Sequence, residues 1–89
     1  MHRRFLVTVI VEPDDGKYHA YCPGLRGVHA DGETPEEAMA NARDGALGTL
    51  RTRLRHGDPI EESPDLRIIE SDLEQPSSAV HGERVVLSA

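Results

Sequence analysis

The chain has 89 residues, the size of one small domain, and its formal net charge of −6 disfavours unaided binding to nucleic acid and favours a basic protein partner. Its single cysteine excludes an internal disulfide and indicates a reducing cytoplasm. No apolar run approaches the length of about 20 residues that a membrane-spanning helix needs.

The first predicted elements are three strands. Residues 5–11 are rich in β-branched side chains and predict the first strand. A turn follows at 13–16, where proline fixes φ and glycine supplies a positive φ. Residues 17–22 and 26–31 predict two further strands, separated by a turn at 23–25. Short connections between successive strands imply an antiparallel meander.

The two turns set an expected register. The first is expected to pair Glu12 with Lys17, and the second to be centred on Gly24, which places His19 directly opposite His29. Both hairpins then give the same apolar face, which we predict to be the core side of the sheet: Phe5, Val7, Val9, Val11, Tyr18, Ala20, Cys22, Val28 and Ala30.

The opposite face of the meander is mixed in character. It carries Leu6, Thr8, Ile10, Glu12, Lys17, His19, Tyr21, His29 and Asp31. A solvated face rarely holds large apolar groups in this number, so the sequence predicts a partner or oligomer interface made by Leu6, Ile10, Tyr21, His19 and His29. The alternative is a partly covered outer face of a small domain.

One long helix is predicted to follow, from Pro35 to about His56. Thr34 is the N-cap, Pro35 occupies the first helical position, and Glu37 completes a capping box. Gly57 is a natural stop after the last turn. Apolar residues at spacings of three and four predict that the helix packs on the sheet through Ala38, Met39, Ala42, Ala46, Leu47, Leu50 and Leu54.

The remainder of the chain predicts little regular structure. Residues 66–70 predict a fourth strand, residues 73–82 a loop, and residues 83–89 a last strand or a tail. We therefore expect one α+β domain over residues 1–72, with a C-terminal tail or extra strand over 73–89. No second amphipathic helix follows Pro64, so a complete DNA-binding domain is not expected.

Two groups of residues have the composition of a chemical site. His19 and His29 lie on the same predicted face as Asp31, and two imidazoles with a carboxylate can bind a transition metal. The alternative, which we favour, is an ordinary polar cross-strand pair. Cys22 lacks a neighbouring base because strand alternation points His19 to the other face, so the thiol is predicted to be a small core residue.

A longer motif spans residues 18–38. Tyr18, Ala20, Leu25, Glu36 and Ala38 stand at fixed spacing among turn and cap residues, which are Pro23, Gly27, Gly32, Thr34, Pro35 and Glu37. In this order the segment resembles the HicB antitoxin family of bacterial toxin–antitoxin systems. The resemblance implies a β-β-β-α-β, partial ribonuclease-H-like fold, self-association, and neutralisation of a small basic HicA-type ribonuclease toxin. Its turn, core and cap residues carry information on fold more than on activity.

The implied fold also raises a nuclease alternative. Ribonuclease-H-like enzymes hold metal ions with carboxylates, including one on the first strand. Here residues 7–11 carry none, and Glu12 is the first acidic side chain, at the end of the strand. We therefore predict a non-enzymatic protein without a cofactor. A stand-alone homo-oligomeric binding module without a toxin is the alternative function, and a metal-dependent nuclease is the weaker one.

Overall fold

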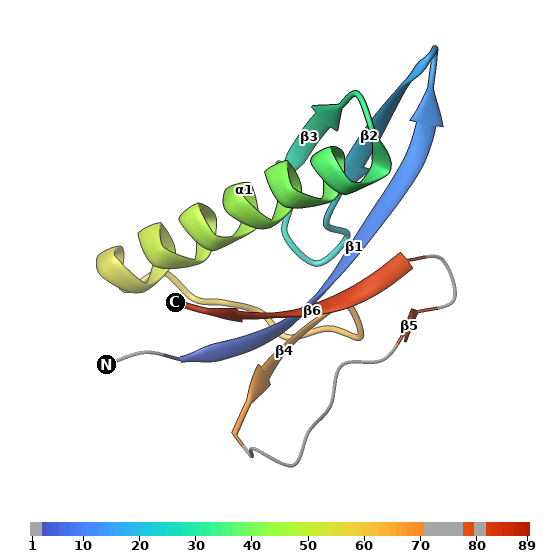
Figure 1. Cartoon of the computed structure of the whole chain (residues 1–89). Coiled ribbons are helices and arrows are strands. Elements are labelled where there is room, and N and C mark those ends of the chain that lie inside the picture. The colour runs from blue at the N-terminus through green and yellow to red at the C-terminus, as the bar shows by residue number, and fades with distance from the viewer. Residues whose placement is uncertain (1–2, 71–77, 80–81) are drawn as a thin grey trace.

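The centre of the structure is one long strand that pairs along both of its edges. The computed structural model describes residues 3–70, 78–79 and 82–89. Its elements in chain order are β1 (Arg4–Asp14), β2 (Lys17–Tyr21), β3 (His29–Gly32), α1 (Pro35–His56), β4 (Leu66–Ile69), β5 (Ser78–Ala79) and β6 (Gly82–Ser88). The sheet is antiparallel with the order β3-β2-β1-β6-β5, and α1 crosses one face (Figure 1). The predicted α+β class is confirmed.

β1 holds the sheet together because it is longer than each of its partners. Its first residues, 4–7, pair with β4, and residues 4–9 pair with β6. Residues 10–14 pair with β2. The backbone N–H of Thr8, which lies between the β4 and β2 pairings, donates to the carbonyl of Asp65 at 3.0 Å. Successive segments of one strand therefore serve the N-terminal hairpin and the C-terminal strands.

The first hairpin is tighter than predicted. Asp14 pairs with Lys17, so the turn contains only Asp15 and Gly16, with φ of 50° and 83°. Positive φ at both central residues indicates a type I′ turn, whose twist matches that of the flanking strands. The predicted pairing of Glu12 with Lys17 was therefore wrong by two residues. Because an even shift preserves side-chain alternation, the predicted faces remain.

The second hairpin also differs from the prediction by two residues. The chain turns twice after β2, with Leu25 N–H donating to Cys22 at 3.0 Å and Val28 N–H donating to Leu25 at 3.2 Å. Gly27 adopts a φ of 89° within this segment. The third strand consequently starts at His29 and not at Arg26.

This register changes the partners of the two histidines. His19 pairs with Asp31, and Tyr21 pairs with His29. The prediction that His19 lies directly opposite His29 was wrong, because the double turn consumes more residues than a turn centred on Gly24. The two histidines are diagonal neighbours on the same face.

The core lies between α1 and the predicted apolar face. Phe5, Val7 and Val9 of β1 are fully buried, as are Ala20 and Leu50. Val11, Tyr18 and Ala30 are partly buried against them. The helix contributes small buried residues, Ala38, Ala42 and Ala46, which let its axis approach the sheet closely.

Both ends of α1 have the predicted caps. The Thr34 hydroxyl accepts from the N–H of Glu37 at 3.1 Å. Glu37 in turn accepts from the N–H of Glu33 at 3.5 Å, one residue earlier than the expected partner Thr34. At the other end Gly57 is left-handed, with a φ of 70°, and Asp58 N–H donates to Arg53 at 2.9 Å. Satisfied terminal groups explain why the helix bounds match the sequence prediction.

The C-terminal segment forms more structure than predicted. Of the two alternatives for residues 83–89, the structure has a strand, β6, which pairs with β1 and buries Leu87. The predicted loop over 73–82 contains β5 and the first residue of β6, while residues 73–77 and 80–81 lie outside the described residues. Residues 82–88 therefore belong to the same sheet as the N-terminal strands.

One residue of the predicted interface is internal. Leu6 exposes only 6% of its surface, and its neighbour Thr8 only 2%. The sequence predicted both on the outer face, but residues of the partner strands lie beside them there: Leu6 stands between Arg67 of β4 and Val86 of β6, and Thr8 stands beside Arg84 of β6. Leu6 is thus a buried side chain in the single chain, and its assignment to a partner surface is corrected.

Candidate functional site

A cluster of ring side chains occupies the outer face of β2 and β3. His19 and Tyr21 lie on β2 and His29 on β3, at positions that alternate with buried residues. Asp31 of β3 and Glu12 of β1 complete the group. We refer to these five residues as the ring cluster. All of them come from the two hairpins, so local strand pairing alone brings them together.

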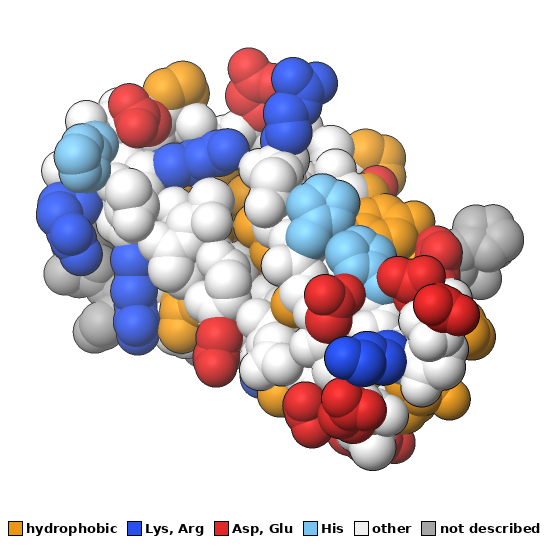
Figure 2. Space-filling view, turned by 90° about the horizontal axis from the view of Figure 1, so that it is seen from above, with side chains coloured by type: hydrophobic (Ala, Val, Ile, Leu, Met, Phe, Trp, Pro, Cys, Tyr) orange, Lys and Arg blue, Asp and Glu red, His pale blue; other side chains and the backbone are white. Residues whose placement is uncertain are grey.

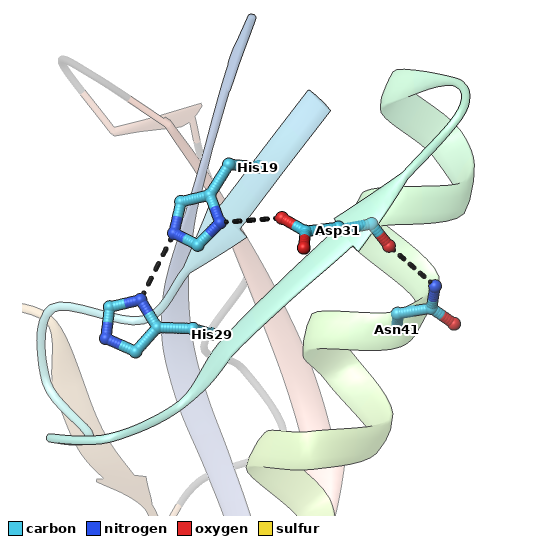
Figure 3. Close-up of polar contacts among 4 residues, drawn as sticks. All are labelled: His19, His29, Asp31 and Asn41. Carbon is cyan, nitrogen blue, oxygen red and sulfur yellow. Dashed lines mark hydrogen bonds and ion pairs between the residues drawn. The ribbon is translucent and has the colours of Figure 1, made fainter. Parts of the chain in front are cut away.

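The two histidines form a hydrogen-bonded chain with Asp31. His19 Nδ1 lies 3.0 Å from Asp31 Oδ1, and His19 Nε2 lies 3.1 Å from His29 Nδ1 (Figure 3). The Asn41 side chain of α1 donates to the backbone carbonyl of Asp31 at 2.9 Å and ties β3 to the helix. An ionised carboxylate can only accept hydrogen bonds, so His19 donates to Asp31 through Nδ1. The hydrogen bond between His19 Nε2 and His29 Nδ1 then contains one proton.

Tyr21 is held at the other side of the cluster. Its hydroxyl donates to Glu12 Oε1 at 3.1 Å. This hydrogen bond to the carboxylate raises the pKa of Tyr21, with smaller contributions from desolvation and from the charge of Glu12. The Tyr21 ring centroid lies 6.0 Å from that of His19 and 6.2 Å from that of His29, with the planes inclined by 24° and 26°. The three rings thus form one surface with similar orientation.

The cluster is accessible to a partner. The His19 side chain is 30% exposed and that of Asp31 is 73% exposed. Ile10, also predicted for the interface, is half-buried and pairs directly with Tyr21. The structure therefore brings together four of the five predicted interface residues, while the buried Leu6 does not take part.

The structure describes both groups of residues that the sequence indicates as candidate chemical sites. Within the part of the chain that the structure describes, no three His, Cys, Asp or Glu side chains are grouped so that they could hold a metal ion. Cys22 is buried, and desolvation raises the pKa of its thiol to about 11. A thiol in this state is a weak nucleophile, as expected of a core residue.

Charge is distributed unevenly around the ring cluster. Residues 12–37 contain seven acidic and two basic side chains, whereas residues 43–55 of α1 contain four arginines and one aspartate. In Figure 2 acidic side chains gather at one end, next to a pair of neighbouring histidine side chains, while most basic side chains lie toward the other end. The net charge alone conceals this asymmetry, which a count of charged residues along the chain reveals.

Comparison with known proteins identifies the family. No protein-family model matches the chain. Over 54 residues, however, it is 54% identical to the UPF0150 protein ssr1765 of Synechocystis sp. (strain ATCC 27184 / PCC 6803 / Kazusa). The aligned segment covers 60% of this chain and 68% of the relative. This chain belongs to the UPF0150 family.

A solved structure places the UPF0150 chain in a wider group. The N-terminal domain of Burkholderia pseudomallei antitoxin HicB is similar over 82% of this chain and 100% of that domain, with a TM-score of 0.54 and 26% identity. The chain is therefore HicB-like, and the resemblance inferred from residues 18–38 is confirmed. Among the described residues, no helix is both long and apolar enough to span a membrane.

Proposed function

We propose that this UPF0150 chain is a non-catalytic, antitoxin-type protein that binds and neutralises a small basic HicA-type ribonuclease toxin in the bacterial cytoplasm. The observation that carries the proposal is the likeness to an antitoxin HicB domain along that domain's whole length. The charge of −6 and the acidic character of residues 12–37 support it, because an acidic surface attracts a basic protein.

The ring cluster and Ile10 are the proposed docking surface. Tyr21 and Ile10 are large apolar side chains that face each other across β1 and β2. Glu12 and Asp31 are exposed carboxylates beside them. Aromatic anchors surrounded by a charged rim are typical of protein interfaces, where the anchors supply affinity and the rim charges accelerate association.

A non-catalytic role fits the arrangement of β1. The strand positions where a ribonuclease-H-like enzyme needs a carboxylate are filled here by buried apolar residues such as Val7 and Val9. Glu12, near the C-terminal end of β1, accepts a hydrogen bond from the Tyr21 hydroxyl instead. The weaker nuclease alternative predicts RNA cleavage that requires Mg²⁺ or Mn²⁺ and is lost in Glu12→Gln or Asp31→Asn; we expect no cleavage.

Self-association through the same face is the second candidate function. A half-buried Ile10 beside the exposed side of Tyr21 is suited to a two-fold contact, in which the same surface of both copies meets. A stand-alone homo-oligomeric module would then need no toxin. We expect light scattering to give a dimer mass at micromolar concentration, and a monomer mass would remove this candidate.

The docking surface is tested with Tyr21→Ala and Ile10→Ala. Thr52→Ala, on the exposed side of α1, is the matched control. Folding is checked by circular dichroism, and each variant is titrated with a HicA-type toxin. We expect the two face variants to bind at least about tenfold more weakly, as truncation of interface anchors does, and the control to bind normally. Unchanged toxin affinity and oligomer mass in folded face variants would contradict the assignment.

A further inference from the structure

The gap between the two imidazoles suggests a second use of the ring cluster, independent of any toxin. His19 Nε2 and His29 Nδ1 point at each other across 3.1 Å. His29 is exposed, and His19 is partly so. We propose that these two nitrogen atoms bind one divalent transition-metal ion of the Zn²⁺ class, with Asp31 as a positioning residue.

The proton arrangement leaves both nitrogens available as ligands. Asp31 accepts the Nδ1 proton of His19, so a neutral His19 presents the lone pair of Nε2 toward His29. His29 now supplies the proton in the gap, but neutral imidazole exchanges between two tautomers. When that proton moves to Nε2 of His29, the Nδ1 lone pair also faces the gap. A metal ion thus takes the position of the proton between the two rings, and His29 keeps that proton on Nε2.

The separation of the two nitrogens is close to the span of a metal-bound pair. Zn–N bonds of about 2.0–2.1 Å in tetrahedral geometry place two ligand nitrogens about 3.3–3.4 Å apart. The observed 3.1 Å therefore has to widen by a few tenths of an ångström. The rings also have to turn, because the two nitrogens now point along the line that joins them and an ion would lie beside that line. The exposed side chain of His29 can make this turn while Asp31 holds His19.

Asp31 prepares His19 for this role. Ligand histidines in metal sites generally donate their second ring nitrogen to a carboxylate or carbonyl, which fixes the tautomer and makes the ligand nitrogen more basic. The contact of Asp31 with His19 Nδ1 has this form, and Asn41 holds the backbone of Asp31 in place. The excess of acidic side chains over residues 12–37 further favours a cation.

The ligand types decide which ions are expected. Imidazole nitrogen suits Zn²⁺, Cu²⁺ and Ni²⁺, whereas Mg²⁺ and Ca²⁺ prefer oxygen ligands. Since no third His, Cys, Asp or Glu of the described residues joins the pair, water molecules complete the coordination. The site is therefore open and suited to reversible binding.

The test is a calorimetric titration with Zn²⁺ at about pH 8, where imidazole side chains in general are neutral. The protein for this titration is prepared without a polyhistidine tag. The substitutions His2→Gln and His81→Gln remove the two histidines outside the described residues, so that these side chains cannot bind Zn²⁺. We expect one Zn²⁺ per chain and no heat from Mg²⁺. His19→Gln or His29→Gln should weaken binding at least tenfold, and Asp31→Asn about tenfold, as is usual for groups that orient a ligand histidine.

His56→Gln is the matched control, because this exposed histidine lies at the far end of α1. Its Zn²⁺ affinity should be unchanged. As a second readout, Zn²⁺ should shift the ¹⁵N resonances of His19 Nε2 and His29 Nδ1 and leave His56 unaffected. Absence of binding at millimolar Zn²⁺, or equal binding by the folded His19→Gln and His29→Gln variants, would overturn the proposal. Toxin binding does not enter either measurement, so failure of the proposed function is distinguished from failure of the metal site.

Discussion

Single residues decide where the helix meets the sheet. Gly32 ends β3 and lies against the first turn of α1, where a Cβ atom would collide with the backbone of Ala38. Backbone cannot give way as a flexible side chain does. Glycine at this position is therefore required by the close approach of two elements, which explains its place in the motif of residues 18–38.

Gly32→Ala should lower the free energy of unfolding by about 1–3 kcal/mol, because an overpacked site forces the strand and the helix apart. Gly48→Ala is the matched control, since a Cβ there meets no atom within 4 Å. The control should raise stability by up to about 1 kcal/mol, through the better helix propensity of alanine. Urea denaturation measures both changes, and a neutral Gly32→Ala would contradict the close contact.

Cys22 illustrates how burial controls reactivity. Desolvation raises the pKa of its thiol from 9.0 to about 11, so the folded chain keeps the proton that the unfolded chain releases. The contribution to stability is therefore complete below about pH 9 and is lost as the pH rises toward 11. We expect a disulfide reagent at pH 8 to label native protein far more slowly than urea-unfolded protein. Equal rates would show that the thiol is accessible.

Among the described elements, β1 pairs with the largest number of strands. Its inward residues form the floor of the core, and its edges pair with β2, β4 and β6. The small residues of α1 belong to the same core cluster as the inward residues of β1. A change in the centre of β1 should therefore affect the whole fold.

Val9→Asp should reduce the free energy of unfolding by about 3–5 kcal/mol, because it places an unpaired charge in the core. Val9 is fully buried, whereas Val11 on the same face is half-buried near the hairpin. Val11→Asp, the control, should be less damaging because its carboxylate can reach water. Thermal unfolding followed by circular dichroism compares the two, and a melting temperature near that of the wild type for Val9→Asp would refute the core assignment.

At the scale of the whole molecule, charge separation is the dominant feature. The hairpin end is acidic, and the C-terminal part of α1 is basic (Figure 2). A basic protein partner should therefore approach the ring cluster end first. Steering of this kind affects the association rate more than the final affinity.

The association rate with a basic toxin should fall as salt rises, because the Debye length shortens from about 10 Å at 0.1 M to about 3 Å at 1 M. Replacing the carboxylates of Asp14 and Asp15 with amides should reduce the rate and its salt dependence. Removal of the two positive charges of Arg51 and Arg55, as the matched control, should not slow association. Stopped-flow kinetics gives these rates, and a salt-independent rate would exclude steering by the acidic end.

The sequence by itself determined the local features of this protein. The bounds of α1 follow from Thr34, Pro35 and Gly57, since capping groups and their partners lie within a few residues of each other. The two sheet faces follow from alternation, which is unaffected by an even shift of register. The family resemblance also follows from local turn and cap residues.

Only the tertiary structure decided which strands and side chains become partners. Several antiparallel registers satisfy the same alternation, so the pairing of His19 with Asp31 depended on the geometry of the connecting turns. The place of β6 beside β1, and with it the burial of Leu6 between two partner strands, depended on contacts between the two ends of the chain. Such distant pairings leave no local pattern, because either edge of a strand offers the same backbone donors and acceptors.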